Sequence, residues 1–233
     1  NLDAIAPLER TNDVAILLNR AGALAEPIVL TVDLQVWDVI AADLDGDGDL
    51  DLAVADGKER SIFVPGGPGA VTVLVNDGQG RFKPYFQLDL EETPSSITAA
   101  DIDGDADVDL LATISRGSES GIPGSLLVLK NEGDGSFADP EISAVGIGPA
   151  KAIAVRLNHD DSLDVAVAHN GSGKVAILLN DGRGSLGEAA FVPVWIDLTN
   201  GDDVARSRSI AAGDIDRDGD TDLLVPFSSV GGN

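Results

Sequence analysis

The chain contains no cysteine and no methionine. Without cysteine it can form no disulfide, no zinc–thiolate site and no cysteine nucleophile, although this absence is compatible with any compartment. Because position 1 is not methionine, we expect the chain to be a processed product or a fragment. Aromatic residues make up only 4% of the sequence, so a hydrophobic core would have to consist of alanine, valine, leucine and isoleucine.

Basic residues are also scarce: 15 lysines and arginines stand against 40 aspartates and glutamates, which gives a formal net charge of −25. Such a surface repels phosphate backbones and anionic lipids, so we expect no nucleic-acid partner. The sequence has no signal-peptide pattern and no run of about 20 apolar residues, so we expect no membrane insertion. Hydrophobic residues nevertheless make up 43% of the chain, which argues against disorder and leaves bound cations as the reason for the acidity.

The chain does contain an internal repeat of about 57 residues. Four stretches, three of them strongly acidic, can be aligned, each between two apolar segments; they begin at Asp43, Asp101, Arg156 and Asp214. After each of the first three, a segment rich in valine and leucine runs into an Asn-Asp-Gly or Asn-Glu-Gly turn. These segments begin at Val71, Leu126 and Val175, and a related one begins at Val14.

Each repeat predicts four short antiparallel strands, because Asn/Asp-Gly between apolar runs is a strong signal for a β-hairpin. No stretch shows helical periodicity over three turns. A repeated four-stranded meander is what the blades of a β-propeller require, so the predicted fold is all-β, with one β-propeller domain. The expected blades span approximately residues 37–94, 95–149, 150–206, and 207–233 joined with 1–36.

The fourth blade is expected to close the ring. Residues 207–233 are predicted to carry the first two strands of a blade, and residues 1–36 the last two. Pairing of these N- and C-terminal half-blades would remove exposed sheet edges, which otherwise template aggregation. The alternative is a fragment of a longer propeller, since propellers of four to eight blades exist.

The acidic stretches have the composition of calcium-binding loops. In residues 43–51, aspartates stand at positions 1, 3, 5, 7 and 9, with glycine at position 6. Aspartates packed so densely repel one another without a counter-ion, and oxygen ligands on a curled backbone are what calcium prefers. An EF-hand is excluded, because its glutamate at position 12 and its flanking helices are missing.

Three loops follow this pattern, and position 7 is expected to contribute its backbone carbonyl, as in the EF-hand loop. The predicted calcium ligands are Asp43, Asp45, Asp47, Asp49 and Asp51 in the first loop, Asp101, Asp103, Asp105, Asp107 and Asp109 in the second, and Asp214, Asp216, Asp218, Asp220 and Asp222 in the fourth. Position 6 of the second loop is Ala106, so we expect slight strain in that turn.

The third loop departs from the pattern. Its positions 1, 3, 5 and 9 are Arg156, Asn158, Asp160 and Asp164. A guanidinium at position 1 would stand where the cation belongs and could form an ion pair with Asp160 or Asp164. Because calcium requires six to eight oxygens, we expect an empty or weak third site and three calcium ions in all.

These repeats resemble the FG-GAP/VCBS family, found in integrin α-subunit propellers and in many secreted bacterial and fungal proteins. The motif D-x-D-x-D-G-x-x-D is met in residues 43–51 and 214–222, nearly met in 101–109 and degraded in 156–164. The resemblance implies calcium bound through positions 1, 3, 5 and 9 and the carbonyl of position 7. It also implies an extracellular or cell-surface protein that acts in adhesion, carbohydrate recognition or protein recognition. Propellers of the family usually have about seven blades, so four repeats are a departure.

A partner would bind at the face opposite the calcium loops, where longer and more varied loops are expected. The candidate ligand-binding residues are Trp37, Arg116, His169, Trp195 and Arg208. The alternative for the two tryptophans is packing between blades, and for the charged residues it is solvation.

The sequence predicts no enzyme. His159 and His169 are the only histidines, and Ser162 near His159 has no oxyanion element beside it. We therefore expect an extracellular recognition or adhesion module, with lectin-like carbohydrate binding as one form of it. The alternatives are a structural subunit of a surface assembly, which would self-associate, and a non-catalytic accessory domain of a larger secreted enzyme.

Overall fold

A computed structural model of the chain describes residues 3–8, 11–32, 35–57, 68–116, 121–170, 172–194 and 205–229. These residues form β-strands, turns and loops and contain no helix, as the sequence predicts. None of them therefore forms a helix with the length and apolarity that crossing a membrane requires.

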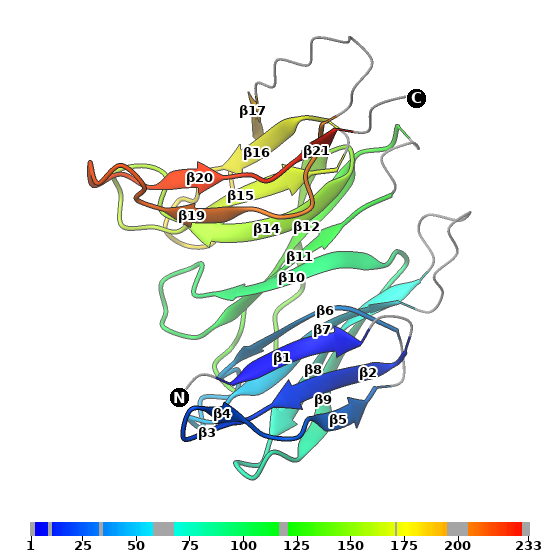
Figure 1. Cartoon of the computed structure of the whole chain (residues 1–233). Helices are drawn as coiled ribbons and strands as arrows, with labels where there is room; N and C mark the ends of the chain where they lie inside the picture. Colours follow the sequence, from blue (N-terminus) through cyan, green and yellow to red (C-terminus); the bar gives the residue numbers. More distant parts are fainter. Residues whose placement is uncertain are drawn as a thin grey trace.

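Three four-stranded antiparallel sheets form the centre of the molecule (Figure 1). We call them blades 1, 2 and 3, and in each the strands pair in chain order. Blade 1 consists of β6 (Gln35–Ala42), β7 (Asp51–Gly57), β8 (Gly69–Asn76) and β9 (Phe82–Leu90). Blade 2 consists of β10 (Pro94–Ala100), β11 (Asp109–Ile114), β12 (Gly124–Leu129) and β13 (Glu141–Gly146). Blade 3 consists of β14 (Pro149–Val155), β15 (Asp164–His169), β16 (Lys174–Leu178) and β17 (Ala190–Pro193).

Incomplete sheets flank the blades on both sides. The N-terminal sheet pairs β1 (Ala4–Leu8), β2 (Asp13–Leu17) and β5 (Ile28–Thr31), with a small hairpin of β3 (Asn19–Arg20) and β4 (Ala23–Leu24). The C-terminal hairpin pairs β19 (Ala211–Gly213) with β20 (Asp222–Leu224), and β18 (Ala205–Arg206) with β21 (Ser228–Ser229).

The predicted closure of the ring is wrong for the described residues. The N-terminal sheet and the C-terminal hairpin are separate sheets, and they lie at opposite ends of the stack of blades (Figure 1). The reason is the strand β1, which the repeat pattern does not predict. It pairs with β2 from Ala4 to Leu8 and so occupies the edge that β20 would need for closure.

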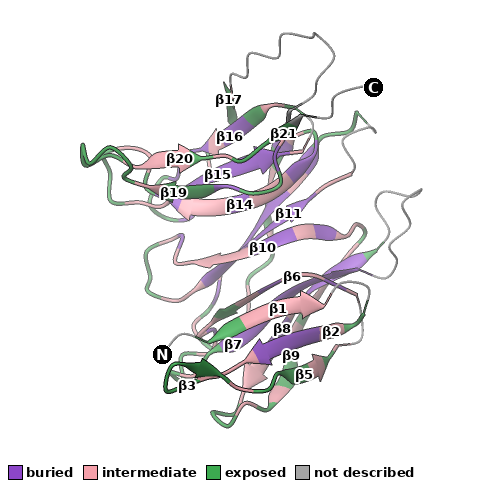
Figure 2. Ribbon diagram, viewed as in Figure 1, coloured by how far each residue is buried: buried purple, intermediate pink, exposed green. Residues whose placement is uncertain are grey.

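The core lies between neighbouring sheets, and the central strands of each blade are the most deeply buried (Figure 2). Four apolar clusters join the N-terminal sheet to blade 1, blade 1 to blade 2, blade 2 to blade 3, and blade 3 to the C-terminal hairpin. The buried apolar side chains among the described residues are all alanine, valine, leucine or isoleucine, which confirms the expectation from the scarcity of aromatics. Each blade therefore depends on its neighbours for stability, as in other repeat proteins.

The inner strands of the three blades are also joined by polar contacts. Lys151 on β14 reaches across β10 to Asp38 on β6, with 2.6 Å between Nζ and Oδ2. On the way its ammonium donates to the carbonyl of Ile97 at 3.2 Å, and the Ile97 N–H donates to Asp38 at 3.0 Å. This half-buried ion pair fixes the spacing of three successive inner strands.

Candidate metal centre

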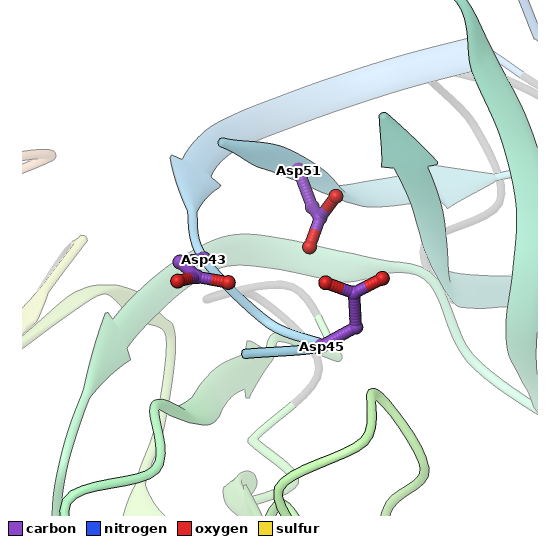
Figure 3. A group of neighbouring side chains, drawn as sticks. All are labelled: Asp43, Asp45 and Asp51. Carbon is purple, nitrogen blue, oxygen red and sulfur yellow. The ribbon is translucent and has the colours of Figure 1, made fainter. Parts of the chain in front are cut away.

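Each of the four loops found in the sequence joins the first strand of a sheet to the second. We call residues 43–51 loop 1, 101–109 loop 2, 156–164 loop 3 and 214–222 loop 4. Carboxylate oxygens come within 4.8 Å of one another in three of them, through the triads Asp43–Asp45–Asp51, Asp101–Asp103–Asp109 and Asp214–Asp216–Asp218. Figure 3 shows the loop 1 triad, whose carboxylates face one another. Carboxylate oxygens arranged in this way are the donor set that calcium prefers.

The backbone of these loops is curled by the aspartate at position 1. In loop 1, Asp43 accepts the N–H of Gly46 through Oδ1 at 2.9 Å and the N–H of Gly48 through Oδ2 at 3.0 Å. Both acceptors recur at Asp101 in loop 2 and at Asp214 in loop 4. The side chain at position 1 therefore closes the turn before any cation binds, and its remaining lone pairs are free to coordinate one.

Positions 4 and 6 of this curl require a left-handed backbone. Glycine supplies it in loop 1, with φ of 75° at Gly46 and 93° at Gly48. Loop 2 places Ala106 at position 6 with φ of 81°, and loop 4 places Arg217 at position 4 with φ of 65°. A left-handed conformation is unfavourable for residues with a Cβ, so the predicted strain at Ala106 is confirmed.

The aspartate at position 9 also has a structural role. Asp51 accepts the N–H of Leu44 in its own loop through Oδ2 at 2.9 Å and the N–H of Asn76, at the end of β8 where the outer hairpin begins, through Oδ1 at 2.8 Å. Asp109 and Asp164 make the same two bonds in loops 2 and 3. All three side chains are fully buried, so position 9 ties the loop to the outer hairpin of its own blade.

The predicted ligands at positions 5 and 7 differ in how they lie relative to the triads. At position 5, Asp47 and Asp105 lie outside the triads of loops 1 and 2, and each accepts the N–H of position 7. At position 7, the Asp49 carboxylate lies against Gly78 of the outer hairpin. This orientation agrees with a contribution from the position 7 carbonyl instead of its carboxylate. In loop 4 the triad includes Asp218 at position 5 instead of Asp222.

Burial and mutual repulsion raise the pKa of several of these carboxylates. Burial raises the pKa of Asp45 and of Asp103, and the neighbouring aspartates raise it further. Burial also raises the pKa of Asp109 to about 6, although the N–H groups of Asn131 and Ile102 oppose the shift. The charged form of these carboxylates is unfavourable in the protein alone. A divalent cation bound next to them would make it favourable.

Loop 3 lacks both the aspartate at position 1 and the left-handed backbone at positions 4 and 6. Arg156 replaces the aspartate that closes the turn, and its Nε donates to the carbonyl of Asp161 at 3.2 Å. His159 and Asp161, at positions 4 and 6, do not have the left-handed φ of the other loops. The predicted ion pair is not seen, because neither Asp160 nor Asp164 forms a salt bridge with Arg156 in this fully described loop.

The predicted ligand-binding residues are scattered over the sheets. Arg116 follows β11 and pairs with Glu92 at 2.7 Å. Arg208 is exposed between β18 and β19, and Trp195 lies outside the described residues. Trp37 is half-buried on β6, and its indole nitrogen would lie 2.9 Å from a Cβ on Gly57, so it packs against β7.

His169 must be corrected as a ligand-binding candidate. Its side chain is 1% exposed, and its Nε2 lies 2.5 Å from the carbonyl oxygen of Val145 in blade 2. Its Nδ1 lies 3.3 Å from the carbonyl of Lys174 on the neighbouring strand. The imidazole is therefore a packed contact between two blades and does not reach a partner on the surface. Only the apolar residues that precede His169 indicate this burial in the sequence.

The fold and the loops define an all-β protein of repeated blades with acidic loops at one end. The profile of the FG-GAP-like repeat matches residues 56–112 and 156–225, more than half of the chain. The chain belongs to this family, which confirms the resemblance noted in the sequence.

No curated protein matches the sequence. Among solved structures, the chain is similar to a lectin from Agrocybe aegerita that recognises non-reducing terminal N-acetylglucosamine. The identity is 20% and the TM-score 0.48, over 78% of this chain and 46% of the lectin chain. It is also similar to the Photorhabdus luminescens Tc holotoxin pore, with 14% identity and a TM-score of 0.38, over 95% of this chain and 12% of that one. The chain thus spans less than half of either protein, and neither likeness is close enough to define a function.

Proposed function

We propose that this protein is a calcium-stabilised recognition module that acts outside the cell or on its surface, and not an enzyme. The observation that carries the proposal is the set of three aspartate triads, each with oxygens within 4.8 Å, in register in a chain of FG-GAP-like repeats. The donors are all hard oxygens, which favours calcium over zinc or copper.

The residues that would hold calcium are those of the triads, with the position 7 carbonyls and the position 5 aspartates of loops 1 and 2. Bound calcium would neutralise carboxylates that otherwise repel one another. Loops 1 and 2 lie where neighbouring sheets meet, so a bound cation there would stabilise the arrangement of the blades. Loop 3 lacks the carboxylate at position 1 and the left-handed turns, so we expect three ions per chain.

The calcium part of the proposal is tested by isothermal titration calorimetry on metal-free protein. We expect about three bound calcium ions per chain and none after the exchange of Asp43, Asp101 and Asp214 for asparagine. Calcium binding that is unchanged in this triple variant would contradict the assignment of the loops.

The recognition part rests on the end of the blades opposite the acidic loops. Arg116 and Arg208 follow or precede strands of different sheets, and variable loops on a rigid scaffold are suited to bind a protein or a glycan. The test is a glycan array and a pull-down from extracellular fractions, each with calcium and with chelator. We expect a ligand whose binding is weakened by exchange of Arg116, Trp195 or Arg208 for alanine. A ligand whose binding survives all three changes would refute this placement of the site.

A further inference from the structure

The outer hairpins of blades 2 and 3 each contain a buried asparagine that contacts two acidic loops at once. Asn131 donates through Nδ2 to the carbonyl of Val108 in loop 2 at 3.0 Å and to the carbonyl of Leu44 in loop 1 at 2.8 Å. The first loop belongs to its own blade, and the second belongs to the preceding blade. Asn131 is also bound by its own hairpin, since its Oδ1 accepts the N–H of Gly133 at 3.0 Å.

The same arrangement recurs one blade further. Asn180 donates to the carbonyl of Leu163 in loop 3 at 2.9 Å and to the carbonyl of Ile102 in loop 2 at 2.6 Å. Its Oδ1 accepts the N–H groups of Gly182 and Gly184 in its hairpin. Because two independent blades place an asparagine identically, the contact is a property of the repeat and not an accident of one loop.

Both contacts meet the preceding loop at position 2, between the ligand positions 1 and 3. The peptide groups on either side of Leu44 are held from two sides: its N–H is bound by Asp51 of the same loop, and its C=O is bound by Asn131 of the next blade. The Leu44 and Ile102 side chains are 1% and 2% exposed and pack in the clusters between the blades. The orientation of the ligands at positions 1 and 3 is thus fixed from the neighbouring blade.

Loop 4 has no such contact among the described residues. No outer hairpin lies against it in the described part of the chain, and Ile215, its position 2 residue, is 59% exposed. The three triad residues of loop 4 are all exposed, whereas each of the other triads contains a fully buried aspartate.

We propose that Asn131 and Asn180 are positioning residues that couple cation binding in one blade to the packing of the next. Asn131 holds loop 1 in its binding conformation, and Asn180 holds loop 2. Coupling free energies are reciprocal, so a cation in loop 1 must in turn stabilise the outer hairpin of blade 2. The inference rests on the proposed calcium binding, and it adds that the affinity of each loop is set by a residue of the following blade.

The first test isolates loop 1 by exchange of Asp101 and Asp214 for asparagine, so that calorimetry reports this one site. In this background we expect Asn131→Ala to weaken calcium binding about tenfold, as for other outer-shell partners of metal ligands. The matched control is Asn180→Ala, which removes an equally buried asparagine that does not contact loop 1. It should leave the affinity of loop 1 within about twofold of the parent.

Three outcomes of this test overturn the proposal. A parent that binds no calcium at loop 1 refutes the proposed metal site and the coupling together. A parent that binds calcium and an Asn131→Ala variant that binds it equally well refute the coupling alone. An equal loss in both alanine variants shows general destabilisation instead of a directed contact, and it also refutes the coupling.

The second test does not depend on an asparagine variant that folds. Hydrogen exchange is measured in saturating calcium on the full chain and on its Asp43→Asn variant, which disables loop 1. We expect amides in residues 131–137 of blade 2 to exchange about tenfold faster in the variant, because coupling free energies typically correspond to factors of about 5–150. Residues 180–186 of blade 3 should be unchanged. Equal protection of residues 131–137 in both proteins would contradict the proposal.

Discussion

Arg156 and Asp161 are joined within loop 3 by a bond from the guanidinium Nε to the backbone carbonyl, 3.2 Å away. In the other loops, the position 1 side chain is an acceptor and closes the turn by binding the N–H groups of positions 4 and 6. The arginine is a donor and can bind only carbonyls, so the turn takes another form. Loop 3 has thus lost its backbone geometry together with its first ligand.

This geometry predicts what would restore the site. Arg156→Asp alone should bind calcium poorly, because loop 3 has a residue with a Cβ at both position 4 and position 6, whereas loops 2 and 4 each have only one. The triple change Arg156→Asp, His159→Gly and Asp161→Gly should add one calcium ion per chain, since glycine supplies that conformation. Calorimetric stoichiometry provides the measurement. A single change that already gives full affinity would show that the backbone imposes no barrier.

Removal of calcium is expected to destabilise the protein. A ligand present at 100 times its Kd contributes about 2.7 kcal/mol for each site. A domain of this size shifts its melting temperature by about 2–4 °C per kcal/mol, so the loss of one saturated site lowers it by about 5–10 °C. Thermal unfolding with and without chelator measures this effect. The Asp43→Asn, Asp101→Asn, Asp214→Asn variant is the control and should melt at the same temperature in both buffers.

The strain at position 6 predicts a pair of opposite effects. Gly48→Ala should destabilise calcium-loaded protein by about 1 kcal/mol, because a Cβ at this φ is unfavourable, while the space around it is open. Ala106→Gly is the reverse exchange at the same position of loop 2 and should stabilise the protein by a similar amount, since both values combine the backbone strain with the larger conformational entropy that glycine loses on folding. Urea unfolding of both variants gives the two values. Changes of the same sign would show that backbone strain is not the determining factor.

The buried imidazole predicts a loss of stability in mild acid. Burial lowers the pKa of His169 below its usual 6.5, and the nearby Lys174 ammonium acts in the same direction. The unfolded chain therefore binds a proton more readily than the folded chain, so the stabilisation present above pH 6.5 is lost as the pH falls below that value. Urea unfolding in saturating calcium at about pH 7.5 and pH 5.5 measures this loss of unfolding free energy.

The matched variants for this prediction are His169→Gln and His159→Gln. The first keeps a donor for the carbonyl of Val145 and should reduce the pH dependence of the unfolding free energy. The second changes an exposed histidine, 93% accessible, and should leave that dependence as it is. If both variants retain the full dependence, groups other than His169 are responsible.

The sequence by itself determined the repeat, the strand class and the acidic loops. Glycine at fixed positions, aspartate in alternation and Asn-Asp-Gly turns are local signals, so loops 1, 2 and 4 could be located from the sequence, and each contains a carboxylate triad in the structure. The lack of a carboxylate triad in loop 3, whose residues are all described, was also expected from Arg156. The compensating ion pair was not, because the direction of a long flexible side chain depends on which acceptors the folded backbone presents.

Only the tertiary structure decided which strands pair and which residues of neighbouring blades are in contact. Strand β1 carries no acidic loop before it and includes Pro7, so its pairing with β2 was invisible in the sequence, and it blocks the expected ring closure. The burial of His169 and the contact of Asn131 with loop 1 depend on the neighbouring blade. A repeat sequence specifies each blade through local periodicity, whereas contacts between blades join residues far apart in the chain, and these appear only when the sheets pack.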